Sequence, residues 1–188
     1  MTEFVDLPEE ESDLDREISQ KLNPAKLRDV LLYLAARIGA KPNVGETVYY
    51  KLLYFIDFDY YEKYGRSITG LTYIKNHYGP TPVQAFADFV SEMEANGDIE
   101  LANTKYYAHT QKKYLPRKKA ELKSLSASEL AHIDWEIDRL SDKSAAELTE
   151  LSHYDTPWLI AETKKPIDYR SVFYRGDNTS VISYDDEL

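Results

Sequence analysis

The feature that most limits the fold of this chain is a long helix with apolar and aromatic side chains on almost every side. The pattern predicts a helix over residues 46–64, ended by Gly65, because glycine favours the backbone conformation that terminates helices. The inner stripe of this helix consists of Val48, Leu52, Phe55 and Ile56. A helix that is hydrophobic all round has no face for water, so we expect it at the centre of the domain.

Start signals predict further helices around the central one. Asn23-Pro24 and Thr81-Pro82 each place a capping side chain before a proline, which the first helical turn tolerates. Ser126-x-x-Glu129 and Ser144-x-x-Glu147 match the capping-box pattern, and Thr156-Pro157-Trp158 begins a short final helix. Each of these helices is expected to turn an apolar stripe towards the core.

The β content is expected to be small. Residues 99–115 alternate in the way that predicts a β-hairpin, whereas residues 66–80 are predicted to be irregular or weakly extended. The expected fold class is therefore α+β and predominantly α-helical, a compact helical domain with one small β-hairpin.

Charge divides the chain into parts. The formal net charge is −10, and residues 1–23 hold eight acidic and two basic residues. We predict an acidic N-terminal arm over residues 1–22 and a polar acidic tail over residues 174–188. Within the arm, residues 14, 18 and 22 are apolar at four-residue spacing, which favours a helix docked by one stripe.

Composition also indicates the compartment. The chain has no cysteine, which excludes disulfides, thiolate zinc sites and a cysteine nucleophile, and fits a reducing environment. Residues 1–11 are acidic without an apolar run, so no signal peptide is predicted. No stretch reaches the roughly 20 apolar residues that span a bilayer. We therefore expect a cytoplasmic protein that contacts no membrane.

Motifs for catalysis are weak. Gly65-x-x-x-x-Gly70 is followed by Leu71, where a phosphate-binding loop needs lysine, and Gly-x-Ser-x-Gly does not occur. His132 and Glu136 share a helix face but have no third ligand placed by the sequence, and His153 is expected to fix a helix junction. Asp57, Asp59 and Glu62 are expected to form salt bridges with Lys51, Lys63 or Arg66. We predict no enzyme activity, no cofactor and no metal.

A basic stretch offers an alternative function. Residues 104–123 contain seven basic residues and one acidic residue, with tyrosines interleaved. A helix followed by a basic hairpin is typical of winged-helix DNA readers, so a DNA-binding transcriptional regulator is the second hypothesis. Against it, the helix predicted after Thr81-Pro82 has no Lys or Arg for base edges and phosphates. Nucleic acid is therefore not the expected partner.

Several motifs, in order, resemble the Panacea-domain family, also called SocA-like antitoxins. The similar segments are Lys51-Leu52-Leu53-Tyr54-Phe55-Ile56-Asp57-Phe58, Tyr64-Gly65-Arg66-Ser67-Ile68-Thr69-Gly70, Tyr78-Gly79-Pro80-Thr81-Pro82 and Leu151-Ser152-His153-Tyr154-Asp155-Thr156-Pro157-Trp158. The resemblance covers residues 23–173. The residues that carry it can also be explained as scaffold residues, which end helices, shape turns or fill the core. The scaffold residues are Lys51, Leu53, Tyr54, Gly65, Gly79, Pro80, His153, Pro157 and Trp158.

This resemblance implies a mostly helical antitoxin. Such a domain neutralises a cognate toxin, usually encoded by a neighbouring gene, through direct protein–protein contact. One member of the family is an adaptor for an ATP-dependent protease, so a protease is a further expected partner. The family brings no catalytic residues.

Candidate contact residues follow from a different argument. Exposed tyrosines are good binding anchors because they bury much area at little entropic cost. Tyr60, Tyr61, Tyr73 and Tyr78 lie near the central helix and the Gly79-Pro80 turn, and we predict partner contacts there. A third hypothesis is an enzyme built from His132, Glu136, His153 or Asp57.

Overall fold

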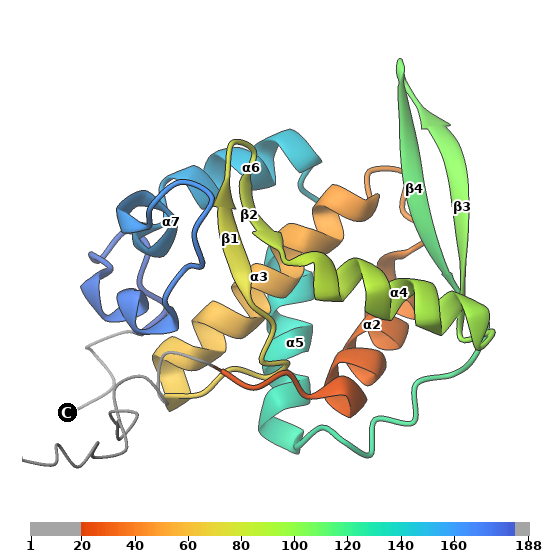
Figure 1. The fold of residues 1–188 in the computed structure, drawn as a ribbon, viewed down its shortest axis with the longest axis horizontal. Helices are drawn as coiled ribbons and strands as arrows, with labels where there is room; N and C mark the ends of the chain where they lie inside the picture. Colours follow the sequence, from red (N-terminus) through yellow and green to blue (C-terminus); the bar gives the residue numbers. More distant parts are fainter. Residues whose placement is uncertain (1–19, 183–188) are drawn as a thin grey trace, which may run out of the picture.

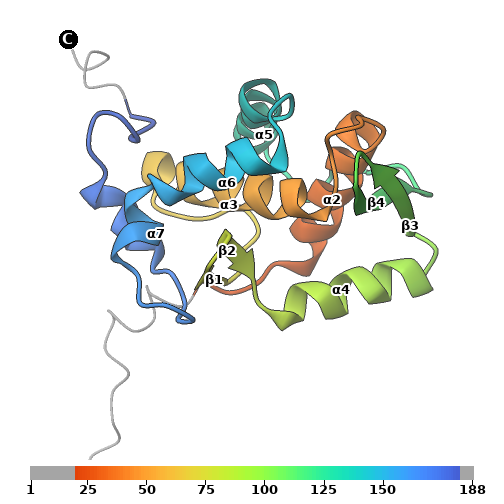
Figure 2. The same ribbon diagram turned by 90° about the horizontal axis from the view of Figure 1, so that it is seen from above.

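A computed structural model describes residues 20–182 of the chain, and α3 (Glu46–Tyr64) runs through its middle (Figure 1). Fourteen of the 19 residues of α3 are buried, which confirms the predicted central helix. It contacts α5 (Ala127–Leu140), α6 (Ala145–His153) and strands from both sheets. Figure 2 shows α6 lying along α3. Gly65 ends α3 in the left-handed conformation, with φ of 69°.

The helix starts follow the local signals closely. The Asn23 side chain caps α2 (Pro24–Ile38) by accepting a hydrogen bond from the Lys26 N–H at 3.1 Å. Both predicted capping boxes, at Ser126 and Ser144, are confirmed at the starts of α5 and α6. The short helix α7 (Thr156–Ile160) begins where it was predicted.

The expected fold class is wrong in its proportions. Helices make up 49% and strands 15% of the described residues, so the fold is α+β and not predominantly helical. There are two small antiparallel sheets within residues 20–182 rather than one hairpin. One pairs β1 (Tyr73–Asn76) with β2 (Gly79–Pro82), and the other pairs β3 (Ile99–Tyr106) with β4 (His109–Pro116).

The prolines explain why β1–β2 was missed. Proline normally argues against a strand, because it lacks the N–H needed for pairing. The Val83 N–H donates to the Thr72 carbonyl, on the β1 side. Because alternate residues of a strand point the same way, the nitrogens of Pro80 and Pro82 face away from β1, where no donor is required. Thr81-Pro82 therefore belongs to a strand, and α4 (Gln84–Ala95) begins two residues later than predicted.

The last elements lie together at one end of the molecule. A 3-10 helix, η1 (Tyr169–Tyr174), contacts α7 and α3. It occupies residues that the sequence led us to place at the border of a polar tail. The proposed boundaries at residues 22 and 173 stay predictions, and most of the arm lies outside the described residues. None of the helices within residues 20–182 combines the length and apolar character needed to cross a membrane.

Candidate functional site

The buried side chain of Lys51 holds the β1–β2 turn in place. Its ammonium donates to the Pro80 carbonyl at 2.9 Å, and burial lowers the pKa of Lys51 to about 8. Gly79 has φ of 97°, and an added Cβ would lie 2.5 Å from Ser152 Oγ and 2.9 Å from Lys51 Cε. The turn therefore requires glycine for both conformation and space.

His153 and Trp158 hold the same turn from the side. The His153 ring stacks on Trp158 with 4.3 Å between the centroids, and its Nε2 lies 3.1 Å from the His77 carbonyl oxygen. The Trp158 indole N–H donates to the Asn76 carbonyl at 3.2 Å. The Lys75 ammonium donates to the carbonyls of Leu159 and Ala161, at the end of α7. The hairpin β1–β2 is thus tied to α6 and α7.

A buried ion network joins α3, α7 and η1. The Arg175 side chain, 1% exposed, donates two hydrogen bonds to Asp155, at 2.8 and 2.7 Å. It also donates to Asp59 at 2.8 Å and to Glu62 at 2.7 Å. The Tyr54 hydroxyl donates to Asp155 at 2.7 Å. Burial raises the pKa of Asp155, and the Arg175 guanidinium opposes that rise.

The predicted partners of the α3 carboxylates are wrong. Asp57 accepts hydrogen bonds from the N–H groups of Ile68 and Thr69 and from the Tyr73 hydroxyl, and burial raises its pKa to about 6. Asp59 pairs with Arg139 and Arg175. The decisive cation, Arg175, was missed because an arginine in a polar segment looks solvent-exposed. The sequence did contain one indication, because α3 has more acidic than basic residues and the excess acids need a cation from another segment.

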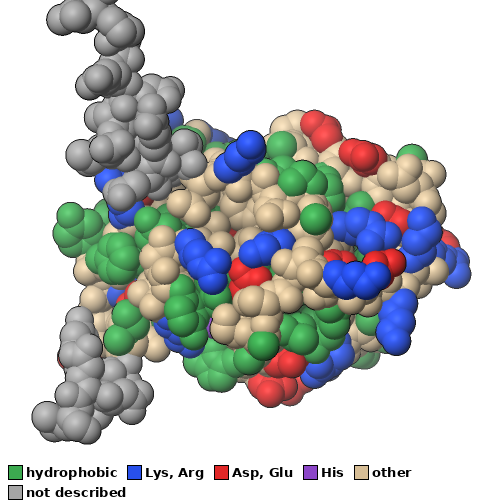
Figure 3. Space-filling model, turned by 90° about the horizontal axis from the view of Figure 1, so that it is seen from below, with side chains coloured by type: hydrophobic (Ala, Val, Ile, Leu, Met, Phe, Trp, Pro, Cys, Tyr) green, Lys and Arg blue, Asp and Glu red, His purple; other side chains and the backbone are tan. Residues whose placement is uncertain are grey.

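Next to this network is an exposed apolar surface. It consists of two pairs of large side chains, one ending α7 and the other ending η1, with exposed fractions of 51–76%: Leu159, Ile160, Phe173 and Tyr174. We call these four residues the α7–η1 surface. A cavity of 510 Å³ lies between the two elements, lined in part by Ile160, Phe173 and Tyr174. Figure 3 shows hydrophobic side chains gathered at the end of the molecule where Figures 1 and 2 place α7.

The sequence model of the antitoxin SocA-like, Panacea domain family matches residues 50–159, more than half of the chain. The chain belongs to this family. No curated protein and no solved structure matches it. The matched residues of the Panacea domain include the Lys51–Pro80 contact, the stacked His153 and Trp158, and Asp155. Arg175, Ile160 and the η1 half of the apolar surface lie beyond them.

The structure places the four predicted contact tyrosines of this Panacea domain very differently. Tyr60, Tyr61 and Tyr73 are buried, because α3 is covered on nearly all sides and β1 lies against it. They do not offer the exposed anchors on which that prediction depended. Tyr78 is 71% exposed at the β1–β2 turn. Tyr61 lies behind the α7–η1 surface, with its ring 5.9 Å from that of Phe173.

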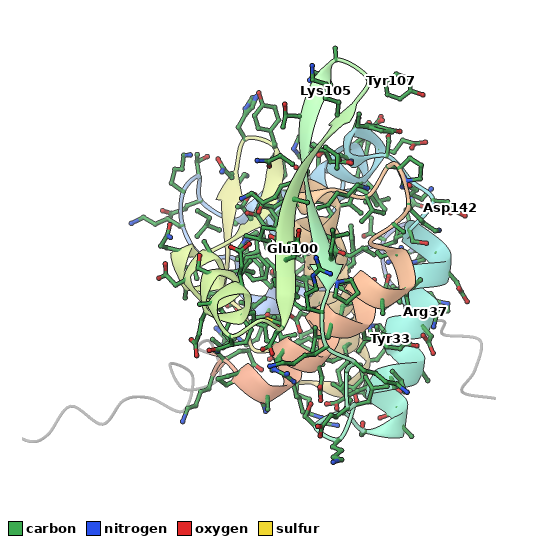
Figure 4. The ribbon with its side chains drawn as sticks, turned by 90° about the vertical axis from the view of Figure 1, so that its right-hand side faces the viewer. Tyr33, Arg37, Glu100, Lys105, Tyr107 and Asp142 are labelled. Atoms are coloured by element: carbon green, nitrogen blue, oxygen red, sulfur yellow. The ribbon has the colours of Figure 1, made fainter. Side chains whose placement is uncertain are left out.

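Most of the basic stretch of the Panacea domain is engaged within the domain. Lys113 is buried and donates to the carbonyls of Lys41 and Val44. The other four engaged bases pair with acids: Lys112 with Glu46, Arg117 with Glu100, Lys118 with Asp98 and Lys123 with Glu121. Figure 4 shows Lys105 with Tyr107 at the tip of the β3–β4 hairpin, away from the body. The four paired cations stay 43–81% exposed, so the acids of the domain offset the charge of this stretch without burying it.

The candidate catalytic residues do not form one site, because His132 approaches Glu136 whereas Asp57 and His153 make other contacts. His132 Nε2 lies 3.0 Å from the Ile56 carbonyl oxygen, and burial lowers the pKa of His132 to about 4. Because His132 is neutral at pH 7, its 3.7 Å approach to Glu136 is not an ion pair. Glu136 accepts hydrogen bonds from the Arg139 guanidinium at 2.7 and 3.1 Å. Within residues 20–182 no group of three His, Cys, Asp or Glu side chains is arranged to hold a metal ion.

Proposed function

We propose that this chain is an antitoxin that neutralises a cognate protein toxin, encoded by a neighbouring gene, by binding it directly. Membership of the antitoxin SocA-like family supports the antitoxin role. The observation that most supports direct binding is the α7–η1 surface. Three of its four large exposed apolar side chains, Ile160, Phe173 and Tyr174, line one cavity, and exposed apolar side chains gathered in this way are typical of protein interaction sites.

A binding role also agrees with what the polar groups already do. Asp57 accepts hydrogen bonds from the segment after α3, and His132 contacts a backbone carbonyl. Asp59 and Asp155 both form ion pairs with Arg175. Asp57, Asp59 and Asp155 find their hydrogen-bond partners inside the domain, as scaffold groups do, whereas His132 Nδ1 is buried without a partner among the described residues. Delivery of the toxin to an ATP-dependent protease and a cytoplasmic location remain predictions.

Co-expression with each neighbouring gene tests the proposal. We expect one neighbour to arrest growth when expressed alone, and growth to return when this chain is co-expressed. The two purified proteins should then form a complex on gel filtration. A chain carrying Arg175→Ala should rescue growth poorly because its fold is destabilised, which would show that rescue needs the folded protein. If no neighbour is toxic, or if rescue occurs without complex formation, the proposal is wrong.

A further inference from the structure

We propose that the toxin docks on the α7–η1 surface through an apolar side chain flanked by carboxylates. This inference rests on the proposed antitoxin function and adds where the partner binds and what chemistry it presents. The toxin would place its apolar side chain in the 510 Å³ cavity between α7 and η1. Docking would remove Ile160, Phe173 and Tyr174 from water, and the hydrophobic effect would stabilise the complex.

The surface is held rigidly from behind. The paired hydrogen bonds between Asp155 and Arg175 connect the residue before α7 to the residue after η1. Trp158 and the Lys75 ammonium secure α7 against the β1–β2 hairpin. The backbone that carries both exposed pairs is therefore fixed before any partner arrives, so binding needs little ordering of the backbone. The signature residues Pro157 and Trp158 directly precede Leu159 and Ile160, which links the scaffold to this surface.

The charged residues beside the surface indicate which charge the partner should carry where it binds. Arg170 and Asp168 line the cavity and pair with each other. Lys164 and Lys165 directly precede Pro166, another lining residue, and Glu162 is the remaining acid of that loop. Lys75 adds a further cation at the end of α7. The Lys164 ammonium donates to the Asn76 side chain, so Lys165 is the cation of this loop with no such contact among the described residues. The four bases of these segments outnumber the two acids, Glu162 and Asp168, which favours carboxylates on the partner.

The two hairpin turns are weaker candidates. Tyr78 is exposed at the β1–β2 turn and Tyr107 at the β3–β4 turn. Each turn offers one large exposed aromatic side chain, and isolated exposed aromatics are common on protein surfaces. By contrast, the α7–η1 surface combines four such side chains with a cavity and a fixed backbone.

The test compares two pairs of substitutions in the full chain. The probe is the purified neighbouring gene product that the co-expression experiment identifies as the toxin. Calorimetry should show that Ile160→Asp with Tyr174→Asp weakens binding at least about 30-fold, the loss expected for hot-spot side chains. The matched control, Tyr78→Asp with Tyr107→Asp, should bind like the wild type. Because all four residues are exposed, we expect both variants to keep the wild-type circular dichroism and melting temperature.

A charge reversal tests the carboxylates separately. Lys165→Glu should weaken binding by about 3- to 10-fold, and the effect should shrink as salt is raised, because salt screens charges at a rim. Lys119→Glu, an exposed lysine on another part of the chain, is the control and should bind normally. An unchanged affinity in Lys165→Glu at low salt would remove the carboxylates from the proposal.

The outcomes separate the two proposals. If the wild type does not bind the neighbouring gene product, the antitoxin function fails and the docking site fails with it. If the wild type binds and Ile160→Asp with Tyr174→Asp binds equally well, only the docking site is wrong. Loss of binding in the hairpin-turn variant would move the site to the turns. A wild type that dimerises through this surface, with normal toxin binding by the variant, would overturn the inference in favour of a second copy.

Discussion

Arg175 shows how far one residue can determine a local fold. Among the described residues, its guanidinium is the cation that pairs with Glu62 and Asp155, and it shares Asp59 with Arg139. Removing one partner of a buried ionic network leaves the others desolvated without compensation.

We therefore expect Arg175→Ala to lower the free energy of unfolding by about 3–5 kcal/mol. Arg37→Ala, which breaks an ion pair with Asp134 at the surface, should cost at most about 1 kcal/mol. Urea titrations of the two variants measure the difference. Equal losses would show that the Arg175 network is not buried as described.

His132 should make the domain sensitive to acid. Its pKa in the folded chain is about 4, whereas the unfolded chain keeps the ordinary value of 6.5. Between these values the unfolded state binds more protons, so stability contributed by neutral His132 is full above pH 6.5 and is lost as the pH falls towards 4. We expect this loss to reach roughly 3 kcal/mol.

A variant isolates that contribution, because Asp57 acts in the opposite direction. The raised pKa of Asp57 favours the folded state as the pH falls through about 6. His132→Gln should remove the His132 term only, so its stability relative to the wild type should rise steadily between pH 6.5 and pH 4. Denaturant titrations across this range measure it, and a constant difference would contradict the assignment.

At the scale of elements, the β1–β2 hairpin depends on one glycine. Gly79→Ala would force a left-handed backbone on alanine and bring its Cβ against Ser152 and Lys51. We expect a loss of about 2–4 kcal/mol, combining backbone strain with overpacking. Gly97→Ala is the matched control, since Gly97 also has positive φ but no atom within 4 Å of an added Cβ, and it should cost about 1 kcal/mol. Thermal unfolding compares the two.

Elements with strong local signals were predictable from the sequence. The apolar circumference of α3 and the capping boxes of α5 and α6 are local patterns, and the structure confirms them. The β1–β2 hairpin was not predictable, because Pro80 and Pro82 are tolerated only through the direction in which their nitrogens face. Likewise, no local pattern reveals that Arg175 reaches α3, since that contact spans 116 residues.

The α7–η1 surface was even harder to predict from the sequence. Tyrosines near the signature were reasonable anchors, yet burial of α3 removes Tyr60 and Tyr61 from the surface. Leu159, Ile160 and Phe173 look like ordinary core residues in the sequence. Their exposure depends on how α7 and η1 pack, which is a tertiary property.

At the scale of the whole molecule, charge separates the two leading functions. The net charge is −10, and five of the seven bases in the stretch over residues 104–123 are held by groups of the domain itself. We expect no measurable binding to duplex DNA from upstream of its own gene at about 50 mM salt, where phosphate contacts are strong. Fluorescence anisotropy tests this. Tight binding that weakens steeply with added salt would revive the regulator hypothesis.

The position of Arg175 also orders events during synthesis. The ribosome makes α3, α7 and η1 before Arg175, so the nascent chain holds the carboxylates of Asp59, Glu62 and Asp155 before their guanidinium exists. The ion network therefore forms only after residue 175 has been translated. Under the proposed function, protection of the cell would depend on antitoxin molecules that were completed before the toxin is made.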